Sequence, residues 1–342
     1  MIDWTVARRV GGLALGDEPE PRLLPGDLIA LAEDAEHRIR TYTGLAPAGP
    51  IPSPETVGRT AWLEANLVSM GRMLDPVTDG FGERLGPLSG PVRSVAGAAL
   101  GAQVGGLGGV LGRRVLGQYD LALLDGEVTP RLLFVEPNLR EAAEELAVDP
   151  SALLAWVCFH EVTHALQFGG VPWLRPHLGG LLEELLADLG TDIDLRELLT
   201  LPSADDLKAF AGALRSGELV RLVGGPEKQA TLDRVQATMA LIEGHAEHVM
   251  DAVGADAIED LPALRAALDR RRENRPGAFA WLEKLLGLEL KLRQYTLGKA
   301  FCDEVVKRAG VPALHVAFAS PERAPSLAEL EDPAGWLERT AA

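Results

Sequence analysis

The stretch DPSALLAWVCFHEVTHALQFGG, residues 149–170, decides how this chain can fold. It opens with Asp149, which can cap a helix, and Pro150, which fits the first helical position. Gly169 and Gly170 can end the helix. Between these signals the residues are apolar nearly all the way round. The stretch therefore predicts a helix that is buried on most of its faces.

The middle of this helix carries the H-E-x-x-H pattern, as His160-Glu161-Val162-Thr163-His164. Positions i and i+4 share a helix face, so both imidazoles can reach a single ion. Glu161 lies about 100° round the helix, close enough to bind a water on that ion. Zinc lowers the pKa of its bound water towards 7, and a carboxylate can take the proton as the water attacks a carbonyl. The pattern predicts a Zn²⁺ hydrolase with His160 and His164 as ligands and Glu161 as the general base.

A catalytic zinc needs a third protein ligand and an open position. A metzincin-type third histidine is excluded, because Gln167 and Gly170 stand where that motif has its glycine and its histidine. The first choice lies in IEGHAEHVMD, residues 242–251. Its E-G-x-A pattern resembles the third-ligand segment of glutamate-type zincins (gluzincins). That resemblance makes Glu243 the third ligand and makes Glu247, on the same helix face, the residue that orients the first histidine.

Two other sets of acidic residues stay open as alternatives. Asp194 ends the segment GTDID and matches the G-T-x-x-D of aspartate-type zincins, although the residues that usually follow are different here. Glu183, Glu184 and Asp188, in LLEELLADLG, fit an ordinary solvated helix face better than a metal site.

Four more polar residues are candidates for the surroundings of the ion. His245 and His248 point away from Glu243 by the helical period, so we expect neither to bind the ion beside it. Either could donate to the oxyanion that forms during hydrolysis, or simply be hydrogen-bonded in a helix packing surface. Arg293 and Tyr295 lie in an otherwise core-forming helix, where an arginine could equally pair with one of the many acids.

The rest of the chain predicts a mainly α-helical protein with a small β hairpin or sheet. Apolar runs at Leu121–Leu124 and Leu132–Val135 flank a turn around Asp125–Gly126, which indicates the hairpin. Residues 1–118 are expected to form a helical region, 119–319 the catalytic region and 320–342 a loosely packed tail, unless the whole is one compact domain. Further helices are expected at residues 26–44, 55–76, 94–112, 226–253 and 278–308.

Charge and cysteine usage narrow the class of protein. A net charge of −17 argues against nucleic acid as a partner, because phosphate binding needs a clustered basic surface. Cys158 and Cys302 belong to no C-x-x-C pair, so we interpret them as buried thiols in a reducing compartment. The N-terminal residues lack an apolar run long enough for a secretory signal. We therefore expect a cytoplasmic protein.

One segment calls for a membrane test. Ser94–Gly112 carries no charge across nineteen residues, and it has small-xxx-small spacings at Gly101, Gly105 and Gly109. It is rich in Gly and Ala rather than in Leu and Ile, so its insertion energy would be marginal. We expect a glycine-rich helix packed closely inside the protein and no membrane span.

Three segments together resemble a largely actinobacterial family of uncharacterised zincin-like hydrolases: HEVTHALQF, EGHAEHVMD and LKLRQYTLGKAFCDEVV. Some of its members are named for an association with the biosynthesis of a deazaflavin coenzyme. The resemblance implies a zincin-like metallohydrolase fold with His160, His164 and Glu243 around the metal and Glu161 as the base. In the zincin pattern an edge strand holds an extended peptide by main-chain pairing, and the likeliest edge by this comparison is Val135–Asn138.

Three functions compete at this point. The first is a cytosolic zinc-dependent peptidase or amidase. The second is a retired hydrolase that keeps the zinc for folding as a structural or scaffold protein, which the intact Glu161 argues against, since a structural site needs no base. The third is an accessory protein linked to deazaflavin coenzyme metabolism, for which the chain offers no phosphate-binding loop.

Overall fold

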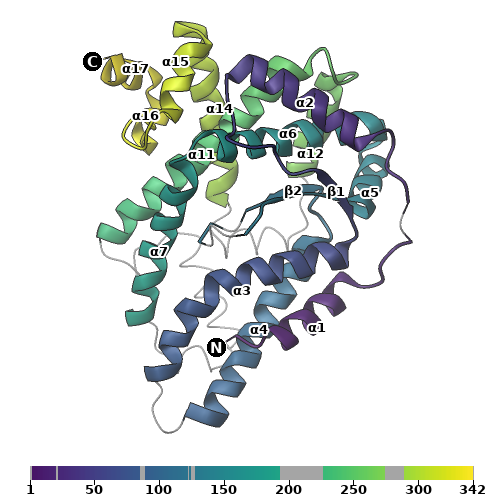
Figure 1. Cartoon of the computed structure of the whole chain (residues 1–342), viewed down its shortest axis with the longest axis vertical. Coiled ribbons are helices and arrows are strands. Elements are labelled where there is room, and N and C mark those ends of the chain that lie inside the picture. Colours follow the sequence, from purple (N-terminus) through teal and green to yellow (C-terminus); the bar gives the residue numbers. More distant parts are fainter. Residues whose placement is uncertain are drawn as a thin grey trace. The chain divides into compact units, whose positions relative to one another are not determined.

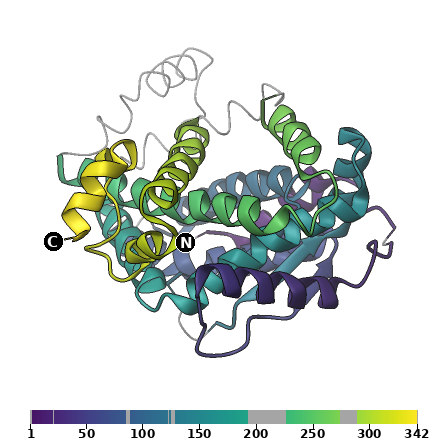
Figure 2. The same cartoon turned by 90° about the horizontal axis from the view of Figure 1, so that it is seen from above.

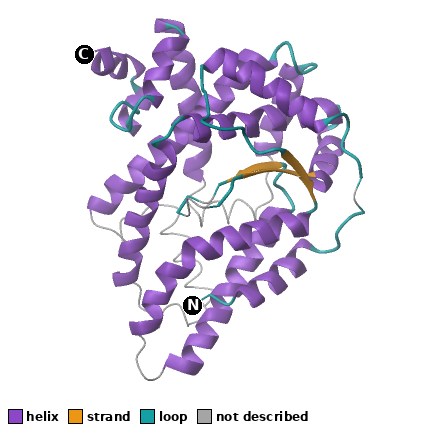
Figure 3. Ribbon diagram, in the orientation of Figure 1, coloured by secondary structure: helices purple, strands orange, loops and turns teal. Residues whose placement is uncertain are grey.

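The computed structural model describes residues 2–20, 22–84, 89–121, 123–124, 128–192, 226–273 and 289–341. The chain divides into two compact units. Unit 1 comprises Met1–Glu36, Pro50–Ala165 and Leu186–Leu199, and unit 2 comprises His37–Gly49, Leu166–Leu185 and Thr200–Ala342. Helices dominate and the strands form a small three-stranded sheet, which confirms the predicted fold class (Figures 1 and 3).

The sheet belongs to unit 1 and has the order β1-β3-β2. β3 (Arg131–Val135) is central, with β1 (Pro54–Val57) parallel on one side and β2 (Gly117–Asp120) antiparallel on the other. Leu132, Leu133, Phe134 and Val135 are fully buried, because a central strand covered on both faces takes a continuous apolar run.

The predicted hairpin is partly correct. Its second strand, Leu132–Val135, is β3, but its first strand is Gly117–Asp120 and not Leu121–Leu124. Gln118 and Asp120 make this strand look polar in sequence, and both side chains are hydrogen-bonded to α3 (Arg59–Arg84). β1 was not predicted, because residues 55–57 were expected to begin the helix at 55–76, whereas α3 begins only at Arg59.

The expectation of an edge strand at Val135–Asn138 is wrong. β3 is flanked on both sides, and residues 136–138 already belong to α5 (Glu136–Leu146). Pro137 explains the change, since a proline near the start of a helix costs no hydrogen bond. The edges of this sheet are β1 and β2.

Three further helices surround the core of unit 1, namely α1 (Trp4–Leu15), α3 and α4 (Ser89–Gly112). The buried core of α1, α3 and β3 consists of Ala7, Leu15, Trp62, Leu63, Leu67, Leu133 and Val135, and Val104 and Leu111 of α4 pack against it. At the start of α1, Asp3 caps the helix by accepting from the backbone amides of Thr5 and Val6.

The glycines of α4 bring its backbone against that of α1. A Cβ added at Gly101 would lie 2.2 Å from Asp3 O, one at Gly105 2.1 Å from Ala7 O, and one at Gly109 2.5 Å from Gly11 O. The segment Ser94–Gly112 is long and apolar enough to cross a membrane by length and composition alone. The small-residue spacing is thus accounted for by packing inside unit 1.

Helix α6 (Pro150–Gly170) carries the H-E-x-x-H pattern and begins and ends as predicted. The backbone amide of Ala152 donates to Asp149 Oδ1 at 2.9 Å, which is the expected cap. All residues from Ala152 to Phe159 are buried. The division between the units falls within this helix, between Ala165 and Leu166.

Unit 2 is built on the crossing of two long helices, α11 (Pro226–Gly254) and α14 (Glu289–Ala309) (Figures 1 and 2). α11 matches the helix predicted at 226–253. The described part of the helix predicted at 278–308 is α14. The remaining helices of the unit include the end of α2 (Leu28–Thr43), the first part of α7 (Leu174–Asp192), α12 (Leu261–Glu273) and α15 (Val311–His315).

The C-terminal residues are packed, whereas we expected a loose tail. They form α16 (Leu327–Glu331) and α17 (Pro333–Ala341), and Ser326 caps α16 with a capping box. Trp336 is fully buried against Phe301 of α14, and its Nε1 donates to Arg323 O at 2.9 Å. One large aromatic side chain holds this segment in the core of unit 2.

Candidate metal centre

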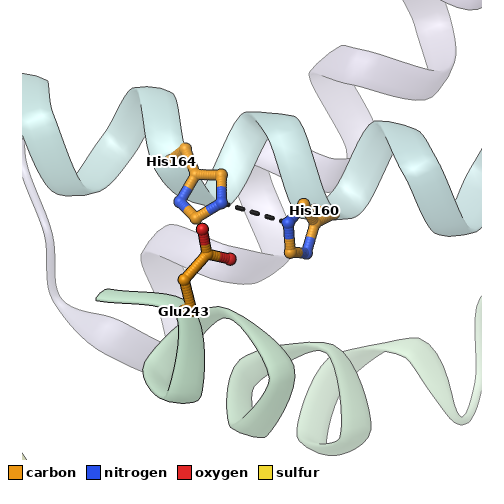
Figure 4. A group of neighbouring side chains, drawn as sticks. All are labelled: His160, His164 and Glu243. Carbon is orange, nitrogen blue, oxygen red and sulfur yellow. Dashed lines mark hydrogen bonds between the residues drawn. The ribbon is translucent and has the colours of Figure 1, made fainter. Parts of the chain in front are cut away.

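His160 and His164 converge on one point beside α6. Their Nε2 atoms lie 3.1 Å apart, and their rings meet nearly at a right angle, with centroids 4.5 Å apart (Figure 4). Tetrahedral zinc with two Zn–N bonds of the usual length would hold two nitrogens about 3.3 Å apart. The pair is therefore close to the geometry that a shared ion needs.

Trp156 supports the first of these histidines. It lies one turn before His160 on α6, and the two rings stack with an interplanar angle of 9° and centroids 5.6 Å apart. Trp156 is itself buried, so it leaves the imidazole of His160 little freedom to rotate. The sequence shows an i, i+4 aromatic pair here, but we had not singled it out.

Glu243 completes a group that can hold a metal ion. Among the described residues, one candidate ligand atom from each of His160, His164 and Glu243 lies within 4.8 Å of the other two (Figure 4). Oε2 of Glu243 is closed off from solvent. Two imidazole nitrogens and one carboxylate oxygen are a donor set that suits zinc and leaves a fourth position for water or substrate.

Gln167 holds the segment next to Glu243 within unit 2. Its Nε2 donates to Ile242 O at 2.8 Å and lies 2.9 Å from Nδ1 of His245. Gln167 and α11 both belong to unit 2, and Gln167 follows His164 by three residues on the same helix. A buried glutamine bonded to the backbone next to Glu243 therefore joins α11 to the C-terminal part of α6, within unit 2.

Gly244 has a packing role next to this ligand. A Cβ there would lie 2.1 Å from the carbonyl carbon of Gly298, and a Cβ at Gly298 would lie 1.9 Å from Ala240 O. The backbones of α11 and α14 therefore touch where Glu243 leaves the helix. The glycine of the E-G-x-A segment is required by this crossing.

The alternatives for the third ligand lie elsewhere or outside the described residues. Glu184 is exposed and its carboxylate accepts from Thr231 and Arg234 of α11, while Glu183 is exposed. Asp194 and the side chain of Asp188 lie outside the described residues. Arg293 and Tyr295 fall within α14, but their side chains are likewise outside what the structure describes.

The two histidines of α11 are engaged in the packing of unit 2. His245 is buried between Gln167 and the ring of Phe318, whose centroid is 4.7 Å away. His248 Nδ1 lies 2.7 Å from Asp303 Oδ1, and its Nε2 lies 2.8 Å from Tyr42 Oη. These contacts fit the packing interpretation of both residues better than the oxyanion interpretation.

Glu247 ends a chain of charged groups. It is buried, and Arg265 of α12 contacts its Oε2 at 3.0 Å. Arg265 also pairs with Asp251, which pairs with Lys299, which pairs with Asp303. The arginine keeps a charged partner beside Glu247, as a buried carboxylate requires.

Two pKa shifts follow from this chain. Burial acts to raise the pKa of Asp303, but hydrogen bonds from His248 and Lys299 outweigh it and hold the pKa below its usual range. Burial, followed by the charge of Asp303, raises the pKa of Tyr42, so its phenol stays protonated. In a neutral His248, Nδ1 therefore donates to Asp303 and Nε2 accepts from Tyr42.

Glu161 lies on the side of α6 that faces strand β2. It is buried, and its Oε2 accepts a hydrogen bond from the backbone amide of Tyr119 at 2.7 Å. The thiol of Cys158, one turn earlier, is buried as predicted, and burial raises its pKa to about 12. The hydrogen bond from the Tyr119 amide could not be predicted from the sequence, because a backbone amide has no signature there.

Two histidines and one glutamate that could hold a single metal ion, with a second glutamate next to the first histidine, are typical of the zinc-dependent hydrolases as a class. The chain belongs to the zincin-like metallopeptidase family, whose model matches residues 2–337. It is similar over its full length to a crystal structure from Chloroflexus aurantiacus described as "a putative hydrolase with a novel fold". The identity is 30%, the TM-score is 0.74, and the match covers 99% of that chain. None of the curated proteins matches.

Proposed function

We propose that this protein is a gluzincin-like zinc peptidase or amidase, with His160, His164 and Glu243 as the metal ligands. The observation that carries the proposal is the convergence of these three side chains, two from one helix and one from another. A zinc ion held there would act as a Lewis acid towards a substrate carbonyl and would make an attacking water more acidic.

Glu161 is the general base of the proposed reaction. It follows the first ligand directly on α6 and is shielded from bulk solvent, so its charge acts at low dielectric. The Tyr119 amide holds one carboxylate oxygen, and we assign the other, Oε1, to the proton that the water gives up. The same carboxyl group can then pass this proton to the leaving amine.

A peptide lying along β2 is the substrate that the sheet favours. Val135 N donates to Leu116 O at 2.9 Å, so residues 116 and 118 face β3 in the antiparallel ladder. Gly117 and Tyr119 then direct their backbone groups away from β3. An extended peptide could pair with the outward groups of this edge other than the Tyr119 amide, which already donates to Glu161. This moves the expected edge from Val135–Asn138 to β2. We propose a cytoplasmic protein that acts on peptides or amides and not on nucleic acid.

The test compares metal content with hydrolysis of a fluorogenic peptide library. We expect about one zinc per chain, and we expect Glu161→Gln to keep it while kcat falls about 10²- to 10⁴-fold. His164→Ala should lose both metal and activity. Glu184→Gln is the matched control, since this acid is exposed and lies on another helix.

Two outcomes would contradict the proposal. A Glu161→Gln variant with full activity would remove this residue as the base. A parent protein that binds zinc, unfolds on chelation and cleaves nothing in the library would favour the structural role instead.

A further inference from the structure

We propose that strand β2 positions the general base, through the backbone amide of Tyr119 and the missing side chain of Gly117. The two residues act together. The amide donates to Glu161 Oε2 at 2.7 Å, and the glycine lets the strand lie directly on the stem of the same side chain. The catalytic part of this inference rests on the proposed function, but the contact itself does not.

Gly117 leaves no room for a side chain. A Cβ there would lie 2.6 Å from Val157 Cγ1, 2.9 Å from Glu161 Cγ and 3.3 Å from Glu161 Oε1. Val157 is β-branched and lies in a buried helix, so it cannot swing aside easily. An added methyl group would therefore push on Glu161 as well as on Val157.

The Tyr119 amide is available because of the register of β2. Tyr119 stands opposite Leu132 in a pair that exchanges no ladder hydrogen bonds, so its N–H points outward from the sheet. Donation to Glu161 then costs the sheet nothing. A bond from an amide to a carboxylate is roughly twice as strong as one between neutral groups.

The strand is also held from the side of α3, which makes it a stiff support. Gln118 Oε1 accepts from Trp62 Nε1 at 2.6 Å and from Asn66 Nδ2 at 3.2 Å. Gln118 Nε2 donates to Asn66 Oδ1 and to Asp120 Oδ1. With Gln118 fixed on one face, the backbone at 117 and 119 has one position from which to meet Glu161.

The contact can be measured in the metal-free protein by amide exchange. The chain has three tyrosines, so ¹⁵N-tyrosine labelling gives three backbone amide signals, and Tyr119→Phe assigns the one at 119. We expect Glu161→Ala to speed exchange of the Tyr119 amide about ten- to a hundredfold. Glu161→Gln keeps an acceptor oxygen and should restore most of the protection.

Gly117→Ala should move the same amide signal and speed its exchange. The matched control is Gly180→Ala, because a Cβ at Gly180 meets nothing within 4 Å. If Gly117→Ala does not fold, Gly117→Ala combined with Val157→Ala removes the closest clash and leaves the one with Glu161. A Tyr119 amide whose shift and exchange are the same in the parent and in Glu161→Ala overturns the proposal.

The catalytic part is tested on the best peptide of the library. Because a misplacement of about 1 Å can cost about 100-fold, we expect Gly117→Ala to lower kcat on that scale. Zinc affinity should stay within about threefold, because the three candidate ligands are unchanged. An unchanged kcat, or a kcat that falls only with zinc affinity, would overturn the positioning role. If no peptide is cleaved, the proposed function is contradicted. The amide-exchange experiment still tests the hydrogen bond between the Tyr119 amide and Glu161.

Discussion

Within each unit, two helices of the described chain pack backbone to backbone. Of these two helix pairs, only the one in unit 2 carries a candidate ligand. In unit 1, Gly101, Gly105 and Gly109 let α4 lie against α1. In unit 2, Gly244 and Gly298 do the same for α11 and α14. Glu243 precedes Gly244, so the second crossing also sets the position of a candidate metal ligand. Close packing at helical glycines therefore contributes to stability in unit 1, and in unit 2 it also fixes the position of a candidate ligand.

The largest effect should come from Gly298→Ala. Its Cβ would lie 1.9 Å from Ala240 O, a backbone atom that cannot move alone. We expect the free energy of unfolding to fall by about 3 kcal/mol through overpacking. Zinc affinity should fall at least about tenfold, because α11 must shift at Glu243.

Denaturant unfolding and a zinc competition titration would measure both quantities for Gly298→Ala. If this variant loses stability but binds zinc as tightly as the parent, the crossing of α11 and α14 does not set the position of Glu243. Gly180→Ala again serves as control, and its open surroundings predict no loss of either quantity.

Gly105→Ala should reproduce the loss of stability without the loss of metal. Its Cβ would lie 2.1 Å from Ala7 O, so we expect unfolding to become easier by about 2 kcal/mol, after a small gain in helix propensity. The zinc titration should match that of the parent. A marked drop in zinc affinity would show that the contrast between the two crossings is wrong.

The smallest effect concerns the charged side chains that accompany the second crossing. Asp303 on α14 binds His248 of α11, and Lys299 on α14 binds Asp251 of α11. The folded pKa of Asp303 is lowered, so its stabilising effect is present above the pKa of an unfolded aspartate, about 3.9. It is lost as the pH falls through the folded value.

Asp303→Asn should therefore be less stable than the parent by up to about 1 kcal/mol between pH 5 and pH 8, since the side chain is partly solvated. The difference between the two unfolding curves should shrink as the pH falls below about 4 and disappear below the lowered folded pKa of Asp303. Glu331→Gln, which changes an exposed carboxylate in another helix, is the control. A difference between parent and Asp303→Asn that does not shrink as the pH falls from 5 to 3 would contradict this account.

The position and the ends of α6 could be predicted from the sequence, because the signals that set them are local. The start of the helix is marked by Asp149 and Pro150 and its end by Gly169–Gly170. His160 and His164 are four residues apart, so they share a face in any α-helix. Glu243 could be proposed from its segment, since a glutamate next to a helical glycine is a local pattern too. What the sequence could not supply is the contact that brings the two helices together, because Gln167 bonds to a backbone oxygen 75 residues away.

The sheet shows the same limit more clearly. β1 pairs with β3 across the whole of α3 and α4, and a four-residue strand beginning with proline gives no signal of its own. The role proposed for β2 uses a backbone amide, which every residue but proline has. Gly117 is the feature of β2 that the sequence does show, because a glycine within a strand often marks the close approach of another element.

The burial of Cys158 also bears on which metals can enter the centre. This thiol precedes the first candidate ligand by two residues on α6, and a thiolate is the donor that soft ions such as Cu(I) prefer. With its pKa raised to about 12, the group is ionised in roughly one molecule in 10⁵ at neutral pH. Burial thus keeps the one thiol of α6 protonated and away from solvent, so a metal ion at the candidate centre would meet imidazole and carboxylate donors and no thiolate from this helix.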